Sequence, residues 1–295
     1  MGERLEPVAA VDSPGGTGAT ASAAALPVPL GGPPRAPTGI AASVRGSWRL
    51  ARAMAHGLHG LAIVLLWFPR LDRTAREKRV RWWAAKMFHM LGMRLEVSGH
   101  FKGGAKLLVA NHISWLDILA VHAACPEARF VSKAEVQQWP LVSRLIAAAR
   151  TLYLQRERAR DALRVVHEMA QALKDGDTVA VFPEGTTGTG HALLPFHANL
   201  LQAAISTGAP VQPLALHFAD ADAAVSTAVD FTGDTTMKQS LWALARARGM
   251  VVRVSVLAPV ATAHADRRAL AERLREVIDG ALVVQRGALS AQRGV

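Results

Sequence analysis

The chain has 295 residues but only one cysteine, Cys125, so it can form no disulfide within itself. It also lacks several catalytic signatures. No lysine follows the glycine-rich stretch 185–190, which excludes a P-loop, and Ser114 has no Gly-x-Ser-x-Gly setting of a hydrolase. The histidines form no tight cluster with the cysteine, so we expect no metal site and no cofactor. Cys125 lies among small apolar residues, which favours a core thiol over a nucleophile.

The positive charge of the chain is concentrated in one stretch. Residues 43–94 hold eleven lysines and arginines against two acidic residues, whereas the whole chain has a net charge of +11. Within this stretch, residues 53–69 contain no charged side chain at all. A basic region with tryptophans is compatible with nucleic acid, but the apolar run inside it favours lipid. We therefore expect membrane lipids as partners and no nucleic acid.

The apolar run is at the lower limit for crossing a bilayer, which needs about 17 residues or more. Basic clusters flank it on both sides, and a single span would carry one of them across the membrane, against the positive-inside tendency. An interfacial helix keeps both clusters beside anionic headgroups, so we favour it over a single span. In residues 75–91 the apolar side chains fall on one helical face, which fits the same surface or a hairpin packed on the core.

The remaining pattern predicts an α/β fold. Residues 1–42 are rich in Gly, Pro, Ala and Ser and are expected to be a disordered tail, followed by membrane-associated helices over 43–92. Residues 93–286 alternate short apolar runs with helical stretches, which predicts a mostly parallel sheet covered by helices on both faces, and 287–295 form a flexible end. The expected strands are Leu95–Val97, Lys106–Ala110, Arg129–Ser132, Thr151–Leu154, Thr178–Phe182, Val211–His217 and Val251–Leu257. The expected helices are Leu116–Ala124, Leu141–Ala149, Glu157–Lys174, Ala198–Thr207, Met237–Ala247 and Asp266–Val284.

A candidate base and carboxylate follow the second of these strands. His112 and Asp117 are five residues apart, so on one continuous helix they would point about 140° away from each other. They can meet if His112 lies on the strand-to-helix turn and Asp117 on the first helical turn, with Asn111 or Ser114 as the cap. The carboxylate would then hold one imidazole nitrogen and leave the other free to take a proton.

Further candidates lie at later strand ends. Glu184, Gly185 and Thr186 form a glycine turn that could bind polar groups of a substrate, or simply end a strand. Arg156 follows another strand and is a candidate phosphate ligand, because a guanidinium can grip phosphate with two hydrogen bonds. The strand beginning at Val211 could line an acyl chain, or be plain core.

These blocks occur in the order Asn-His-x-Ser-x-x-Asp from Asn111, a strand ending at Arg156, Phe-Pro-Glu-Gly-Thr from Phe182, and Val-x-Pro from Val211. In that order and spacing the chain resembles the glycerolipid acyltransferase family, and among its members the bacterial 1-acylglycerol-3-phosphate acyltransferases, over about residues 75–260. One position departs from the family pattern: Arg150 stands where the second block usually opens with glycine.

The resemblance implies that His112 is the general base, with Asp117 as its partner. It also implies that Arg156 and the Glu184–Thr186 block bind the phosphate-bearing acceptor, and we add Asn111 and Ser114 to the substrate-binding candidates. The expected reaction makes phosphatidic acid from 1-acyl-sn-glycerol-3-phosphate, with acyl-CoA or acyl-carrier protein as co-substrate, at the cytoplasmic face of the inner membrane. Three alternatives stay open: another acceptor such as a lyso-ornithine lipid, a lipid hydrolase, and a non-catalytic membrane-surface protein.

Overall fold

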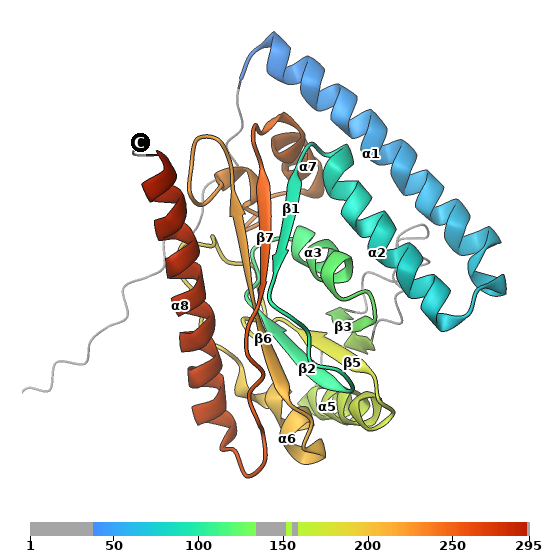
Figure 1. Cartoon of the computed structure of the whole chain (residues 1–295), viewed down its shortest axis with the longest axis vertical. Helices are drawn as coiled ribbons and strands as arrows, with labels where there is room; N and C mark the ends of the chain where they lie inside the picture. Colours follow the sequence, from blue (N-terminus) through green and yellow to red (C-terminus); the bar gives the residue numbers. More distant parts are fainter. Residues whose placement is uncertain (1–37, 134–151, 155–158, 294–295) are drawn as a thin grey trace, which may run out of the picture.

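The computed structural model describes residues 38–133, 152–154 and 159–293 (Figure 1). In this part of the chain, seven strands form one sheet in the order β1-β7-β6-β2-β5-β3-β4. Five neighbouring strands from β6 to β4 run parallel, whereas β7 pairs antiparallel with β6, and β1 runs parallel to β7. The strands are β1 Arg94–Ser98, β2 Lys106–Ala110, β3 Ala128–Lys133, β4 Leu152–Leu154, β5 Thr178–Val181, β6 Val211–Ala219 and β7 Val251–Val256.

The mostly parallel sheet predicted from the sequence is confirmed, and all seven expected strands occur. The ends differ by a few residues: β5 stops at Val181 rather than Phe182, and β6 continues to Ala219 rather than His217. The reversed direction of β7 and β1 was not predicted, because the alternation of apolar residues carries no information on strand direction.

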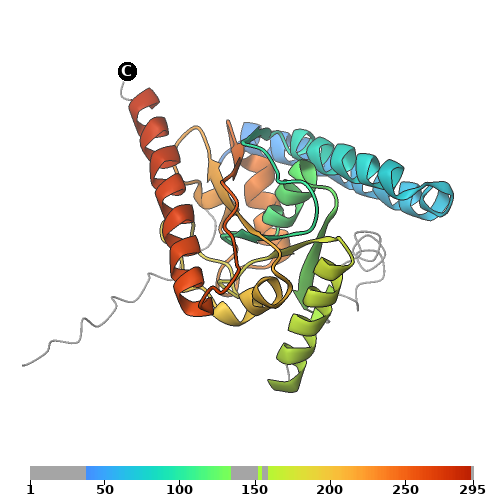
Figure 2. The ribbon, with the colours of Figure 1, turned by 60° about the horizontal axis from the view of Figure 1, so that its bottom comes forward.

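Helices cover both faces of the sheet (Figure 2). Because a strand is pleated, its successive side chains point to opposite layers. In β2, Leu108 and Ala110 face a core made with α2 and α3, whereas Leu107 and Val109 face a second core made with α5, α6 and α8. The two cores sandwich the sheet, so its central strands are apolar on both sides. The helices are α1 Ile40–Leu66, α2 Arg73–Met90, α3 Leu116–Ala124, α5 Ala159–Lys174, α6 Gln202–Thr207, α7 Met237–Arg246 and α8 Arg267–Arg293, with short 3₁₀ turns η1 Phe68–Arg70, η3 Ala198–Leu201 and η4 Thr227–Val229.

Most predicted helices are found, with corrected limits. Leu116–Ala124 matches α3 at both ends, whereas the expected Ala198–Thr207 divides into η3 and α6. The last helix does not end at Val284 but runs to Arg293, so residues 287–293 continue a helix where a flexible end was expected. Its start is capped by Asp266, whose carboxylate accepts hydrogen bonds from the main-chain N–H groups of Arg268 and Ala269. The predicted helix Leu141–Ala149 lies outside the described residues.

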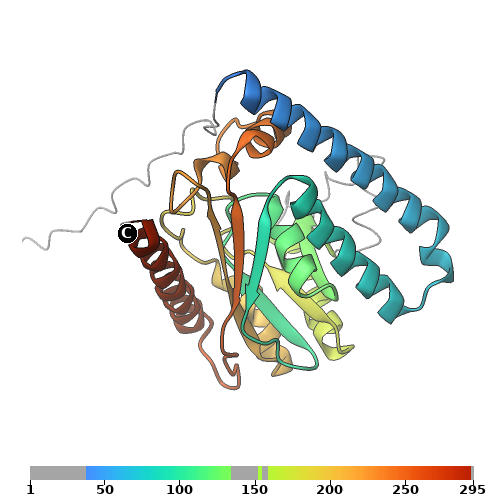
Figure 3. The same cartoon turned by 45° about the horizontal axis from the view of Figure 1, so that its top comes forward.

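The two N-terminal helices form a hairpin that packs on the sheet layer (Figure 3). Helix α1 begins at Ile40, inside the expected tail, and α2 begins after Asp72, which caps it by accepting from the N–H of Ala75. The helices touch closely at Gly60, where an added Cβ would lie 2.1 Å from Nε1 of Trp83. The apolar face predicted for α2 packs inward, with Met87 and Leu91 buried, so this face is part of the core and not a membrane surface.

Arginines join α1 to the carboxyl end of α7. Arg45 donates to the carbonyl of Arg246, and Arg49 donates to the carbonyls of Ala245 and Ala247 at 3.1 and 2.6 Å. The last carbonyls of a helix have no partner within the helix and attract cations. Part of the first basic cluster therefore holds the fold together, rather than being free to meet headgroups as the sequence analysis expected.

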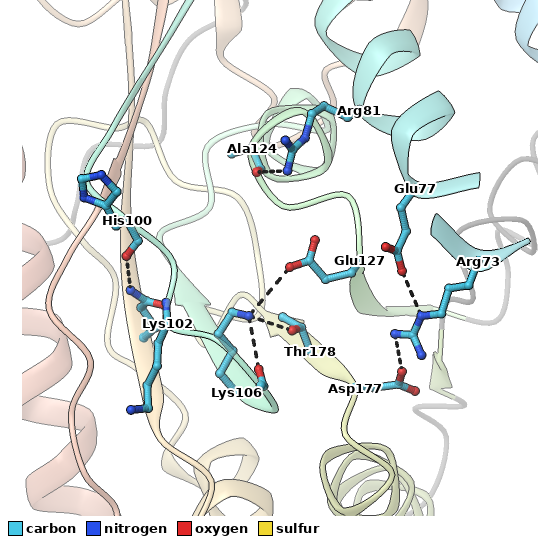
Figure 4. Close-up of polar contacts among 12 residues, drawn as sticks. Arg73, Glu77, Arg81, His100, Lys102, Lys106, Ala124, Glu127, Asp177 and Thr178 are labelled. Carbon is cyan, nitrogen blue, oxygen red and sulfur yellow. Dashed lines mark hydrogen bonds and ion pairs between the residues drawn. The ribbon is translucent and has the colours of Figure 1, made fainter. Parts of the chain in front are cut away.

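A second group of polar contacts between elements lies where β2 and β5 begin (Figure 4). The buried carboxylate of Asp177 accepts from Arg73 on α2 at 2.8 Å and from Arg129 on β3 at 2.7 Å. Two charge-assisted bonds from two elements fix the start of α2 relative to the sheet. Nearby Cys125 is 1% exposed, as expected of a core thiol, and burial raises the pKa of its thiol.

Candidate functional site

The His112 imidazole and the Asp117 carboxylate meet at the end of β2, on the turn that leads into α3. Nδ1 of His112 lies 2.8 Å from Oδ2 of Asp117, which confirms the predicted contact. The same oxygen accepts from the main-chain N–H groups of Ile113 and Ser114 at 2.6 and 2.9 Å. Asp117 is fully buried, whereas the His112 side chain is 19% exposed. The carboxylate is thus fixed by the turn, and it fixes the ring that reaches the surface.

Neither proposed cap acts as a simple helix cap on α3. The Ser114 hydroxyl accepts from the N–H of Leu116, two residues along, at 3.0 Å and is completely buried. Asn111 instead bonds twice to the main chain of Leu216 on β6: its Nδ2 donates to the carbonyl at 2.9 Å and its Oδ1 accepts from the N–H at 2.8 Å. Both side chains are occupied within the protein, which favours roles in shaping the turn over contact with a substrate.

Glu184 lies opposite His112, on the turn after β5. Its Oε1 accepts from the main-chain N–H of His112 at 2.7 Å, and its Oε2 accepts from the N–H of Leu194 at 2.8 Å. The side chain is 4% exposed, and this burial raises the pKa of the carboxyl to about 7, although the two N–H groups lower it. Glu184 therefore clamps the loop 185–197 to the turn of His112, and its carboxylate faces the protein.

The glycine turn beside Glu184 has the geometry that the sequence suggested. Gly185 has φ 71°, a left-handed conformation that glycine adopts without strain. Its Cα is covered by the exposed His197, whose ring a Cβ at Gly185 would approach to 3.1 Å. Thr186 is exposed and remains available to a ligand. The position of His197 was not predictable from the sequence, because no motif connects it to a turn twelve residues earlier.

Aromatic and main-chain contacts complete the surroundings of His112. The ring of Phe182 stacks on the imidazole, with centroids 4.1 Å apart and planes at 9°. The carbonyl of His112 accepts from the N–H of Gly188 at 2.8 Å. With Glu184 on its N–H, the main chain of His112 is therefore tied to the loop after β5 at both polar atoms.

Helix α8 holds the far part of the same loop. Arg275 donates to the carbonyl of Leu193 at 3.1 Å, and Arg286 donates to the carbonyl of His191 at 2.7 Å. On the other side, the hydroxyl of Thr187 donates to the carbonyl of Phe231. These partners were not predictable from sequence patterns, because each contact joins residues more than forty positions apart.

Two other predictions have different outcomes. Arg156 lies outside the described residues, so its role as a phosphate ligand stays a prediction. The strand from Val211 is buried at every position of β6, which makes it core and not the wall of an open acyl groove. Among the described residues, no group of three or more His, Cys, Asp and Glu side chains is arranged to hold a metal ion.

The arrangement is suited to proton transfer. When Nδ1–H of His112 donates to Asp117, Nε2 is left as an acceptor, and the buried carboxylate stabilises the imidazolium that forms. Among the described residues, no serine hydroxyl or cysteine thiol forms a hydrogen bond with the His112 imidazole.

Comparison with known proteins defines the class. The family model described as Acyltransferase matches residues 94–217. The lyso-ornithine lipid O-acyltransferase of Pseudomonas aeruginosa is 35% identical over 239 residues, which cover 80% of this chain and 92% of that protein. The chain belongs to the acyltransferase family, and it is an enzyme of the lysolipid acyltransferase type.

One further relative supports this assignment, and a solved structure shares the fold. The 1-acyl-sn-glycerol-3-phosphate acyltransferase of Neisseria meningitidis is 34% identical over 173 residues, covering 58% of this chain and 67% of that protein. The crystal structure of the 1-acyl-sn-glycerophosphate acyltransferase PlsC from Thermotoga maritima has the same fold, with a TM-score of 0.60 at 22% identity, over 81% of this chain and 93% of that one.

Proposed function

We propose that the enzyme transfers an acyl chain from acyl-CoA or acyl-carrier protein to the free hydroxyl of 1-acyl-sn-glycerol-3-phosphate, which makes phosphatidic acid. The observation that carries the proposal is the contact of 2.8 Å between the buried Asp117 and His112, whose side chain is partly exposed. The relative from Neisseria meningitidis is named a 1-acyl-sn-glycerol-3-phosphate acyltransferase, and that name contains the same acceptor.

In the proposed reaction, Nε2 of His112 takes the proton of the acceptor hydroxyl as its oxygen attacks the carbonyl carbon of the thioester. The carbon–sulfur bond then breaks, and the leaving thiolate takes the proton back from the imidazolium. Asp117 holds the ring and stabilises its charge throughout. A general base of this kind contributes about 10²–10⁴-fold in rate. No cofactor is needed, because the thioester supplies the activated acyl group.

A second acceptor is supported by one specific observation. The relative that aligns over 92% of its own length is named a lyso-ornithine lipid O-acyltransferase, and its match extends over more of this chain than that of the Neisseria enzyme. The same base would activate the hydroxyl of a lyso-ornithine lipid. The choice between the two acceptors lies in headgroup contacts, for which Arg156 and Thr186 are our candidates.

We further propose that the enzyme works at the cytoplasmic face of the inner membrane, with α1 lying in the interface. Helix α1 is apolar and long enough to be membrane-associated, and its outer face exposes Val44, Trp48, Met54 and Leu58. The opposite face packs on α7 and α2, with buried residues from Ala42 to Ile63. A helix that packs on its own protein along one face and exposes apolar side chains on the other supports surface attachment over a span.

The test is an acyl transfer assay with purified wild type and His112→Ala. Lysophosphatidic acid and lyso-ornithine lipid are offered in parallel, each with acyl-CoA and with acyl-carrier protein thioester. We expect one acceptor to be acylated and His112→Ala to lose at least about 100-fold in turnover. The matched control, His167→Ala, removes an exposed histidine on α5 and should leave turnover unchanged.

Other outcomes separate the alternatives. Release of free fatty acid without an acceptor would identify a hydrolase. Liposome binding that survives His112→Ala, without any consumption of thioester by the wild type, would identify a non-catalytic membrane protein. A folded His112→Ala protein with normal acylation would exclude His112 as the base.

A further inference from the structure

We propose that Phe182 is a positioning residue for acyl transfer, whose ring holds the plane of the His112 imidazole and stabilises the imidazolium formed during the reaction. This inference rests on the proposed role of His112 as the base. Phe182 is the first residue after β5. In the sequence it ends an expected strand and opens the Phe-Pro-Glu-Gly-Thr block, but neither pattern gives its side chain a role.

The two rings of the pair are stacked face to face. The two ring centroids are 4.1 Å apart and the planes are inclined by 9°, so the face of the benzene ring covers the face of the imidazole. A cation over an aromatic face is attracted by the ring quadrupole, by about 0.5–2 kcal/mol depending on desolvation. The neutral imidazole gains less from this contact, so the ring favours the protonated form.

The position of Phe182 is itself fixed from behind. Phe130 on β3 stacks on Phe182, with centroids 5.6 Å apart and planes at 21°, and Phe130 is 3% exposed. Phe130 pairs with Ala180 on β5, and Phe182 lies two residues beyond Ala180, so the two rings are diagonal neighbours on the same side of the sheet. A ring supported by the core cannot move away when the imidazole becomes charged.

Among the described residues, Phe182 restrains the plane of the His112 ring, which the hydrogen bonds of His112 leave open. Asp117 holds the ring at its edge through Nδ1, and Glu184 and Gly188 hold the main chain. None of these three contacts covers the face of the imidazole. A hydrogen bond at one edge still lets the ring tilt about that bond, whereas a stacked partner fixes its plane, so the direction in which Nε2 points depends on Phe182.

The experiment compares Phe182→Leu, which removes the ring, with Phe182→Tyr, which keeps it. We expect Phe182→Leu to lose roughly 2- to 30-fold in kcat, the range that cation–π energies imply. KM for both substrates should stay near the wild-type value, because Phe182 acts through His112. Phe182→Tyr should restore most of kcat. Phe101→Leu, at another partly buried phenylalanine that packs on the same core, is the control and should leave kcat unchanged.

The pH dependence separates stabilisation of charge from simple packing. Loss of the ring face disfavours the imidazolium, so the acidic limb of kcat/KM should move to lower pH in Phe182→Leu and stay in place in Phe182→Tyr. The titratable groups of the described residues that face His112, Asp117 on α3 and Glu184 after β5, are the same in both variants. Asp117 and Glu184 therefore cannot produce a difference between the pH profiles of the two variants.

Equal kcat and equal pH profiles in the wild type and Phe182→Leu would overturn the inference. An equal loss in both variants, with no change in pH profile, would also overturn it, because packing alone would then explain the loss. If Phe182→Leu does not fold, Phe182→Met takes its place as a ringless side chain of adaptable shape. A wild type that acylates no acceptor would instead refute the proposed function itself.

Discussion

The carboxylate of Glu184 accepts a hydrogen bond of 2.7 Å from the main-chain N–H of His112, across 72 positions of sequence. Its second oxygen holds Leu194 at 2.8 Å. We expect Glu184→Gln to lower kcat/KM by roughly 5- to 150-fold, because one amide oxygen cannot serve both donors, and an unpaired buried N–H costs about 1–3 kcal/mol. Steady-state kinetics check this. Glu272→Gln, an exposed glutamate on α8, is the control. A variant with wild-type kcat/KM would contradict the clamp.

The same carboxyl predicts how stability depends on pH. Burial raises its folded pKa from 4.5 to about 7, so between these values the folded protein holds a proton that the unfolded chain has lost. The stability that this bound proton contributes is fully present below about pH 4.5 and is lost as the pH rises through 7. The unfolding free energy of the wild type relative to Glu184→Gln should therefore be larger at pH 5 than at pH 8, by about 3 kcal/mol at most. Urea unfolding at the two pH values measures this difference, and a constant value would argue against it.

The Asp117 carboxylate should matter for catalysis more than for folding. In Asp117→Asn the amide oxygen can take the place of Oδ2 and keep the bonds from Ile113 and Ser114. The negative charge that stabilises the imidazolium is lost, so we expect kcat to fall by about 10²–10⁴-fold with little change in melting temperature. Single-turnover acylation and thermal melts measure the two effects. Asp222→Asn, an exposed aspartate, should alter neither, and a large drop in melting temperature for Asp117→Asn would make the loss structural.

The contact between α1 and α2 can be tested with two glycines of the same helix. A Cβ at Gly60 would meet Trp83 at 2.1 Å, whereas a Cβ at Gly57 would meet nothing within 4 Å. Gly60→Ala should therefore destabilise the protein by about 1–3 kcal/mol, because the hairpin must open. Gly57→Ala should be neutral or stabilise by up to about 1 kcal/mol through helix propensity. Denaturant unfolding compares them, and equal values would show that the helices do not pack as described.

The outer face of α1 predicts membrane binding that depends on its apolar side chains. Trp48 and Leu58 are 65% and 63% exposed, and each would gain about 1.5–3 kcal/mol on burial in a bilayer. The double change Trp48→Ser and Leu58→Ser should lower cosedimentation with anionic liposomes by at least about tenfold. Val284→Ser removes a side chain of similar exposure, 72%, from α8 and should have no effect. Unchanged binding of the double variant would move the membrane face elsewhere.

Local patterns were enough to predict the order of strands and helices and the meeting of His112 with Asp117. Both depend on residues within a few positions of each other: apolar alternation for the strands, and a turn of five residues for the pair. The direction of β7 and the inward orientation of Glu184 were not predictable in this way. They depend on which strands become neighbours, and β2 and β5 are separated by about seventy residues of sequence.

The arginines of α1 are a second case in which local sequence patterns were not enough. A basic cluster before an apolar helix indicated contact with headgroups, but Arg45 and Arg49 bond to carbonyls of α7 about two hundred residues away. Sequence reveals how much charge is present and where along the chain it lies. Which charges turn inward depends on the helix end that the fold brings beside them, and the described structure supplies that information.

Helix α8 is the last element of the chain, yet two of its arginines hold the loop that surrounds His112. The C-terminus is therefore not a neutral place for engineering. Trimming the chain before Arg286 would release one tether of that loop, whereas trimming before Arg275 would release both and would also remove the buried Ile278 and Leu282 from the core. A loss of activity on trimming before Arg286 would therefore indicate that the loop around His112 needs its tether to α8.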